Sequence, residues 1–189
     1  MGISIATAAA VCGAEVQLVA GPGVATPEGS PYHVHRVTSA AEMAEACFRL
    51  FPHCDIAILA AAVADFTPEI AHVTKVKRGS DDFIIRLKPT TDIAAALGSA
   101  KKSNQTLAGF ALETDNEIEN AVGKLQRKNL DMIVLNSLRD EGAGFGVATN
   151  RVTIIDRYNK IDKFELKPKD EVAYDILKKI ASLRQKMRK

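Results

Sequence analysis

The pattern of apolar and polar positions alternates between helix-like and strand-like segments along the first third of the chain. Residues 2–12 predict a helix that ends at Gly13, because glycine suits a helix C-cap. Ser39 and Glu42 form a capping box for a second helix over 40–51. The strand-like segments are Glu15–Ala20, Tyr32–Thr38 and Ile56–Ala62. The last of these is a continuous apolar run, which is typical of a strand buried on both faces of a parallel sheet.

A predicted antiparallel hairpin interrupts this alternation, which then resumes and is followed by a second hairpin. We expect the first hairpin to pair Val73–Lys77 with Phe83–Lys88, and the second to pair Val152–Asp156 with Lys163–Leu166. The remaining predicted strands and helices are Gln105–Phe110, Asn116–Asn129, Met132–Leu135 and Asp170–Leu183. This order predicts one α/β domain over 1–189, a Rossmann-like three-layer α/β/α sandwich with β-hairpin excursions.

The start of the chain is unusual for this fold class. Met1 and Gly2 lead directly into helical residues, whereas a Rossmann-like domain begins with a strand and a glycine-rich turn. We therefore expect the first strand of the sheet to be missing, and the domain to be truncated at its N-terminus.

Composition narrows the function classes. The net charge of +2 over 189 residues is too small to indicate nucleic-acid binding, and no apolar stretch reaches the ~18 residues of a membrane span. The three cysteines form no C-x-x-C pair, and no Cys/His set has the spacing of a metal site. We expect reduced cysteines, a cytoplasmic location and no protein-built metal site.

Two motifs follow predicted strands, where ligands gather in open α/β sheets. In the first, residues 61–66, small side chains allow close approach of a ligand, and Asp65 either caps a turn or faces that ligand. In the second, residues 109–115, Glu113 and Asp115 either cap the next helix or hold a metal-bridged phosphate or a ribose.

Basic and glycine-rich motifs add a possible phosphate site. Lys124 and Lys128 share a helix face at i and i+4, so their charges repel unless an anion such as a triphosphate lies nearby; the alternative is a solvated face. Asn136 ends a strand before the glycine-rich residues 142–146, which either cradle a nucleotide or form a plain turn. The basic hairpin residues Lys75, Lys77 and Arg78 also suit a charged edge that discourages aggregation.

Taken in order, the motifs cover the chain from Met1 to about Leu177. They are Ala-Ala-Val-Ala-Asp-Phe (61–66), Lys-Val-Lys (75–77), Leu-Lys-Pro-Thr-Thr-Asp-Ile (87–93), Gly-Phe-Ala-Leu-Glu-Thr (109–114), Lys-Leu-x-x-Lys-x-x-Asp (124–131), Asn136 and Gly-Phe-Gly (144–146). This ordered set resembles bacterial phosphopantothenoylcysteine synthetase. In bacteria that domain is usually the C-terminal half of a fused flavoprotein of coenzyme A biosynthesis that also contains phosphopantothenoylcysteine decarboxylase.

The resemblance implies an activity and a set of residues. The activity is ligation of 4′-phosphopantothenate and cysteine through an acyl-cytidylate, with CTP and Mg²⁺, and it gives Lys124 and Lys128 catalytic roles. The residues implied for nucleotide binding are Gly109, Phe110, Ala111, Glu113, Asp115, Lys124, Lys128, Asn136, Gly144, Phe145 and Lys169. Those implied for substrate binding are Ala62, Val63, Ala64, Asp65, Phe66, Lys75 and Lys77.

The sequence departs from the family at its start. The family's strand, glycine turn and a segment containing Asn and Ser-Gly-Lys precede the residues that match Met1 and Gly2, and an asparagine of that segment acts on the acyl-nucleotide. We therefore expect this chain to need such a segment for turnover. The decarboxylase half is also absent, so no flavin is expected, whereas the family implies a homodimer.

Two rival hypotheses remain. One is a dinucleotide-binding oxidoreductase, which is weakened because no G-x-G-x-x-G follows a predicted strand. The other is an inactive nucleotide-binding fragment.

Overall fold

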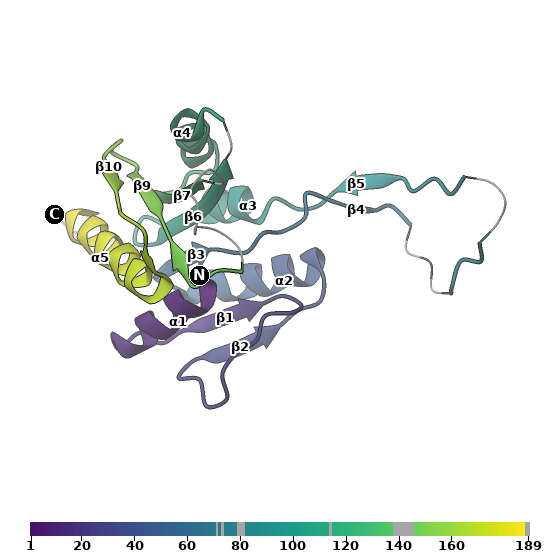
Figure 1. Cartoon of the computed structure of the whole chain (residues 1–189), viewed down its shortest axis with the longest axis horizontal. Helices are drawn as coiled ribbons and strands as arrows, with labels where there is room; N and C mark the ends of the chain where they lie inside the picture. The colour runs from purple at the N-terminus through teal and green to yellow at the C-terminus, as the bar shows by residue number, and fades with distance from the viewer. Residues whose placement is uncertain (71, 73, 79–81, 114, 138–145, 188–189) are drawn as a thin grey trace.

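The computed structural model describes residues 1–70, 72, 74–78, 82–113, 115–137 and 146–187 (Figure 1). The elements before the central excursion are α1 (Gly2–Val11), β1 (Gln17–Ala20), β2 (His33–Arg36), α2 (Ala40–Leu50), the 3-10 helix η1 (Phe51–His53) and β3 (Ile56–Leu59). The excursion contains β4 (Phe66–Pro68) and β5 (Leu87–Pro89). The elements after it are α3 (Ile93–Ala100), β6 (Thr106–Glu113), α4 (Glu117–Arg127), β7 (Met132–Ser137), β8 (Thr149–Asn150), β9 (Val152–Asp156), β10 (Ile161–Lys163), β11 (Lys167–Pro168) and α5 (Lys169–Met187).

The core of the fold is a five-stranded sheet in the order β10-β9-β7-β6-β3. Strands β3, β6 and β7 are parallel, while β9 and β10 complete the sheet in antiparallel fashion. The parallel strands end at one common edge of the sheet, which we call the carboxyl edge, and begin at the opposite amino edge. The closing hairpin has the predicted first strand, but its second strand is Ile161–Lys163, not Lys163–Leu166, because left-handed Asn159 (φ 59°) closes a tighter turn.

Helices cover both faces of this sheet, which confirms the predicted α/β sandwich (Figure 1). Alternate strand residues, among them Met132 and Val134, pack against α1 and α5, whereas Ile133 and Leu135 pack against α2, α3 and α4. This two-sided burial follows from the period of two along a strand.

The sheet is interrupted between β1 and β3. Strands β1 and β2 form a separate parallel pair, and β6 is the one strand among the described residues to which β3 is hydrogen-bonded. The prediction that Ile56–Ala62 is a strand buried on both faces is therefore wrong: it ends at Leu59, and Ile56 is 38% exposed. The described residues contain no strand ahead of α1, and the missing first strand stays a prediction.

A long arm, defined here as residues 65–90, leaves the body between β3 and α3 (Figure 1). Thr90 N–H donates to Asp65 O at its base, and β4 pairs with β5 just beyond. The arm was predicted as a hairpin, but its paired strands lie nearer the base than Val73–Lys77 and Phe83–Lys88. Its exposed apolar side chains are Phe66, Ile70, Val76, Phe83, Ile84, Ile85 and Leu87.

Local signals explain the helices well. Ser39 Oγ accepts the Glu42 N–H at 3.2 Å, as in the predicted capping box. The Glu42 carboxylate accepts the N–H of Thr38 at 2.8 Å, one residue before the N-cap Ser39. Gly13 adopts φ 86° after α1, as a C-terminal glycine should. All three cysteines are unpaired thiols. No helix in the described part of the chain combines the length and apolar character needed to span a bilayer.

Candidate functional site

The carboxyl edge of the parallel strands gathers most of the predicted site residues. Strand β6 runs through Glu113, three residues beyond its predicted end, so Gly109, Phe110 and Ala111 lie inside the sheet. A Cβ at Gly109 would meet Leu130 Cδ1 at 2.8 Å, so this glycine is explained by packing. Ala111 is likewise buried in the core. Glu113 is the last residue of β6, so its side chain lies at the carboxyl edge of the sheet.

Lys124 lies beside Glu113. Its Nζ is 2.6 Å from Glu113 Oε1, and the side chain of Lys124 is 37% exposed. Asn120 Nδ2 approaches the other carboxylate oxygen at 3.4 Å. The Lys124 contact is an ion pair without the alignment of a hydrogen bond, since the same Oε1 has no hydrogen-bond partner among the described groups. The ammonium is thus held at the edge by one carboxylate and keeps access to solvent.

Lys128 has a separate partner, Asp92. The two charged groups are 3.0 Å apart, and the Lys128 side chain is 30% exposed. Asp92 is also the N-cap of α3, where its carboxylate accepts the Ala95 N–H at 3.0 Å. Burial acts to raise the pKa of Asp92, but the Ala95 N–H and the Lys128 ammonium together hold that pKa below its usual value. Asp92 is therefore charged at neutral pH.

The environment of the two lysines corrects one step of the sequence argument. Their mutual repulsion does not require an external anion, because Glu113 and Asp92 already offset it. A fully solvated helix face is also wrong, since both side chains are about two-thirds buried. The lysines are positioned cations with one carboxylate each, and each keeps further N–H donors for a ligand.

The region between β6 and α4 is acidic. Asp115 precedes the helix, Asn116 adopts the left-handed conformation with φ 45°, and the first turn carries Glu117 and Glu119. The side chain of Asn116, the N-cap residue of α4, makes no capping hydrogen bond. This helix end is less suited to a phosphate than the lysine pair, because its own carboxylates offset the helix dipole.

Asn136 lies at the end of β7, on the face of the sheet opposite to Glu113. Its Oδ1 accepts a hydrogen bond at 3.2 Å from Nδ2 of Asn150, a buried residue that the sequence analysis missed. No local pattern marks Asn150, since its importance depends on a neighbour 14 residues away.

Lys169 begins α5, and its backbone N–H donates to Ala148 O at 3.0 Å. This hydrogen bond ties the start of α5 to the segment that leads into β8.

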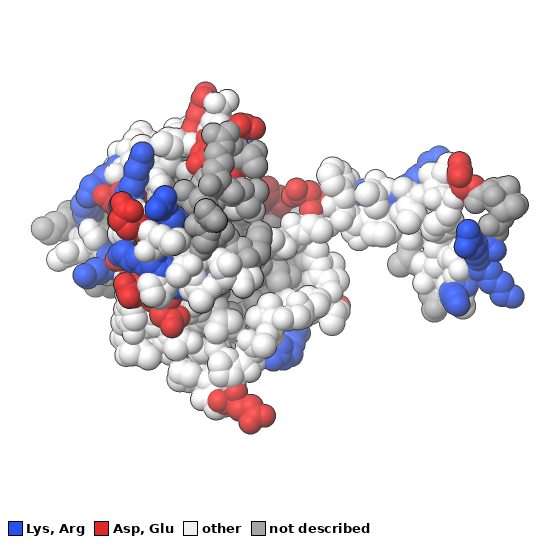
Figure 2. Space-filling model, in the orientation of Figure 1, with Lys and Arg blue, Asp and Glu red and all other residues white. Residues whose placement is uncertain are grey.

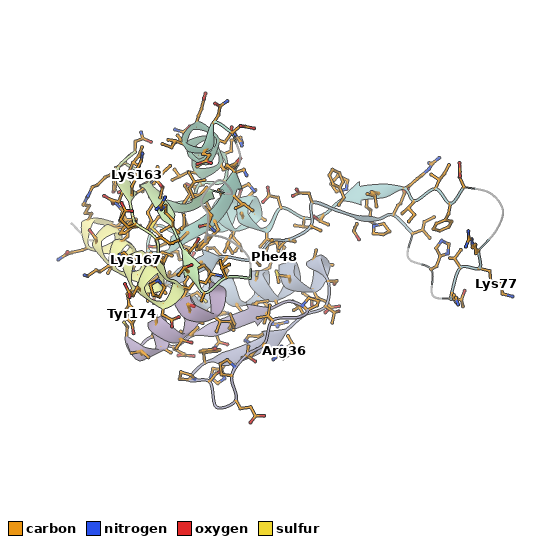
Figure 3. All side chains as sticks on the ribbon, in the orientation of Figure 1. Arg36, Phe48, Lys77, Lys163, Lys167 and Tyr174 are labelled. Carbon is orange, nitrogen blue, oxygen red and sulfur yellow. The ribbon has the colours of Figure 1, made fainter. Side chains whose placement is uncertain are left out.

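The predicted substrate residues lie at and beyond the base of the arm. Ala64 O accepts the Thr90 Oγ1 hydroxyl at 2.6 Å, Val63 is half-buried, and Ala62, Asp65 and Phe66 are exposed. Lys77 lies at the far end of the arm, pointing away from the body (Figure 3), and Lys75 is also exposed. Figure 2 shows a group of basic side chains at this tip. Within one chain, Lys77 lies remote from the body of the domain (Figure 3). Gly144 and Phe145 lie outside the described residues.

Two hollows of the described surface lie elsewhere. An apolar cavity of about 180 Å³ is lined by residues of α2, η1 and α3, and a polar depression lies at Asp55, Asn104 and Arg184 on the amino edge. Neither contains the lysine pair, so the carboxyl edge is identified by its chemistry, not by the depth of a cavity. No group of three or more potential metal ligands occurs in the described part of the chain.

The fold and these polar groups define a Rossmann-like α/β domain with two lysines and an amide at the carboxyl edge of its sheet. Residues 1–183 match the family model of the DNA/pantothenate metabolism flavoprotein C-terminal domain. The chain belongs to this family.

Relatives agree with this assignment. The crystal structure of the C-terminal domain of coenzyme A biosynthesis bifunctional protein CoaBC matches with a TM-score of 0.80 and 36% identity, over 98% of this chain and 82% of that one. The coenzyme A biosynthesis bifunctional protein CoaBC of Bacillus subtilis (strain 168) is 41% identical over 184 residues, 97% of this chain and 45% of that protein. A protein from an unknown prokaryotic organism, named cysteine/cysteine sulfinic acid decarboxylase, is 63% identical over 183 residues, 97% of this chain and 51% of that protein. The chain spans about half the length of these two relatives.

Proposed function

We propose that this chain is a phosphopantothenoylcysteine synthetase domain, which joins 4′-phosphopantothenate to cysteine with a nucleoside triphosphate. The supporting observation is the pair of half-buried lysines at the carboxyl edge, each held by a single carboxylate. The family and the likeness to the CoaBC C-terminal domain support the substrate class. A dinucleotide-binding oxidoreductase finds no support in these relatives.

The reaction has two steps. A carboxylate oxygen of phosphopantothenate attacks the α-phosphorus of the nucleotide, the bond to the β-phosphate breaks, and pyrophosphate leaves. The cysteine amine then attacks the acyl carbon, loses its proton to solvent, and releases the nucleoside monophosphate. Negative charge grows on the phosphates in the first step, and the ammonium groups of Lys124 and Lys128 stabilise it.

The nucleotide of this proposal is CTP, which enters with Mg²⁺ as the counter-ion of its phosphates. Binding of Mg²⁺ through the nucleotide phosphates is consistent with the described residues. Glu113 is paired with Lys124, and no group of three potential metal ligands occurs among the residues described. Backbone groups near Ala111 and the loop around Phe145 are the proposed readers of the base. Lys169 and Asn136 complete the nucleotide side of the site.

Phosphopantothenate occupies the base of the arm at residues 62–66, and the tip lysines act on it from a second subunit. The arm carries seven exposed apolar side chains, which a homodimer would bury. Removal of the arm tip should convert a dimer into a monomer in sedimentation velocity, whereas an unchanged dimer would exclude this interface. A cytoplasmic location is part of the same proposal.

The name of the 63% identical relative raises a second candidate, decarboxylation of a cysteine-type acid. This chain matches half of that protein, so the name can describe its other half. A single assay separates the two candidates, because ligation releases pyrophosphate whereas decarboxylation releases carbon dioxide.

The test is turnover of 4′-phosphopantothenate, cysteine and CTP·Mg²⁺, followed by mass spectrometry of the product and by pyrophosphate release. It is run on the purified protein and on a form preceded by the N-terminal segment of the Bacillus subtilis relative. We expect one amide product per pyrophosphate, at least in the extended form, and weaker binding of ATP than of CTP. Absence of product from both forms would contradict the ligase proposal, and equal affinity for ATP would contradict the base selectivity alone.

A further inference from the structure

Asn150 is a buried amide close to the carboxyl edge. It is 1% exposed, and its backbone lies in β8, opposite Lys167 of β11. Its side-chain Nδ2 donates to Asn136 Oδ1 at 3.2 Å. The hydrogen bond joins strand β8 to the end of β7, where Asn136 is half-buried.

The other end of the Asn150 amide is not satisfied. Its Oδ1 is buried and has no hydrogen-bond partner among the described groups. An unpaired buried carbonyl destabilises the folded state, so stability alone does not explain an asparagine here.

Gln105 provides the contrast, as a buried amide at the amino edge. Its Nε2 donates to Phe51 O at 2.7 Å and to Cys54 O at 2.8 Å, and its Oε1 accepts the Lys102 N–H at 2.9 Å. Both ends of that amide are used in holding the fold. In Asn150 the NH₂ group is hydrogen-bonded and the carbonyl oxygen is not, and the NH₂ group donates to Asn136, a residue of the candidate site.

The contact fixes the orientation of the Asn136 amide. Because its Oδ1 is occupied by Asn150, Asn136 keeps its two Nδ2 donors for another acceptor, and the described residues supply none. The reverse orientation would present a carbonyl oxygen, which repels the acceptor oxygens of a nucleotide.

We propose that Asn150 is a positioning residue, which orients Asn136 so that its NH₂ group donates to an acceptor of the bound nucleotide. Asn136 shares a sheet face with Val134, toward α1 and α5, whereas Glu113 and Lys124 lie on the α4 side. The amide therefore contacts a part of the nucleotide other than the phosphates held by the lysines. This inference rests on the proposed nucleotide-dependent function.

The test is a double-mutant cycle read by calorimetric titration with CTP·Mg²⁺. Asn150→Leu removes the donor but keeps the branched shape of the side chain, so the Kd should rise on the order of tenfold in the parent. In an Asn136→Ala background the same change should have no further effect. Asn150→Asp should weaken binding to a similar extent, because an acceptor at this position turns the Asn136 NH₂ inward.

Melting temperatures separate this role from a structural one. Asn150→Leu should melt at or above the parent temperature, while the control Gln105→Leu should melt lower and keep its CTP affinity. A Kd change below roughly twofold, or equal effects in both backgrounds, would overturn the positioning role. A parent that does not bind CTP would overturn the proposed function together with this inference, whereas normal CTP binding with uncoupled variants would overturn the inference alone.

Discussion

The two edges of the central sheet hold charges in different ways. At the amino edge, Asp131 is fully buried and is contacted at 2.8 Å by Lys101 Nζ, by Arg157 Nη1 and by the Leu107 N–H. At the carboxyl edge, Lys124 and Lys128 are about one-third exposed, and each has one carboxylate partner among the residues that the structure describes.

The amides follow the same division, since Gln105 is fully hydrogen-bonded whereas Asn150 is not. Saturated polar groups have no capacity left for a ligand, so they hold the fold together. Partly satisfied groups at the ends of parallel strands retain donors and acceptors. The amino edge is therefore structural, and the free donors and acceptors of the carboxyl edge support the proposal that a ligand binds there.

The largest expected effect is at Asp131. Asp131→Asn leaves the ammonium of Lys101, which is 7% exposed, without its countercharge, so the free energy of unfolding should fall by roughly 3–5 kcal/mol in urea titration. Asp55→Asn is the matched control, because Asp55 is 73% exposed and its loss should cost below about 1 kcal/mol. Equal, small losses for both variants would show that the amino edge is not the structural one.

A second prediction concerns acid stability at the same edge. Lys179 Nζ contacts Asp156 Oδ2 at 2.7 Å and Asp162 Oδ2 at 2.8 Å. Burial acts to raise the pKa of Asp156, but Lys179 and the N–H groups of Lys160 and Tyr158 hold that pKa below its usual value. Hydrogen bonding by Lys179 lowers the pKa of Asp162 as well.

A carboxylate with a lowered pKa contributes stability above its unfolded pKa and loses it as the pH falls through the folded value. Burial acts to lower the pKa of Lys179, but its two carboxylate partners raise that pKa above its ordinary value of 10.5. The stability that Lys179 contributes is therefore lost only at a pH above that value. The stability that Asp156, Asp162 and Lys179 contribute should therefore be level from mildly acidic to mildly alkaline pH and fall below about pH 4. Asp156→Asn should make the acid fall shallower, and an unchanged acid limb in that variant would refute the assignment.

The smallest effect is expected at Asp92. Asn caps helices as well as Asp does, and a half-exposed ion pair contributes little, so Asp92→Asn should change stability by less than about 1 kcal/mol. CTP affinity should stay the same or rise, because Lys128 loses a competing carboxylate. Weakening as large as that of Lys128→Gln would mean that Asp92 orients the lysine for the ligand.

Local sequence signals predicted the parts of the fold that depend on near neighbours. The Ser39–Glu42 cap and the helices α1, α2, α4 and α5 follow from residues a few positions apart, whereas α3 was not predicted. The strands of the arm were misplaced, because Phe83–Lys88 has high strand propensity but only its last residues have a partner across the ribbon. The exposure of Ile56 was not predicted either, because an apolar run in the sequence does not reveal how many strands flank it in the sheet.

The candidate site was predicted in part for a related reason. The i, i+4 spacing identified the lysines, but their partners Glu113 and Asp92 lie 11 and 36 positions earlier and could not be paired from sequence. Asn150 depends on a contact across two strands, which is visible only in the fold.

The most direct test of the central claim is CTP·Mg²⁺ affinity of Lys124→Gln and Lys128→Gln, with Lys160→Gln at the amino edge as the control. A charge-assisted hydrogen bond contributes roughly 1.5–3 kcal/mol, so Lys124→Gln and Lys128→Gln should each raise the Kd about 10- to 150-fold. Melting temperatures should stay near that of the parent, because Gln has good helix propensity. The Lys160 variant should bind like the parent, since that ammonium is 64% exposed and far from the carboxyl edge. A Kd within roughly twofold of the parent for both Lys124→Gln and Lys128→Gln would contradict a phosphate site at the carboxyl edge.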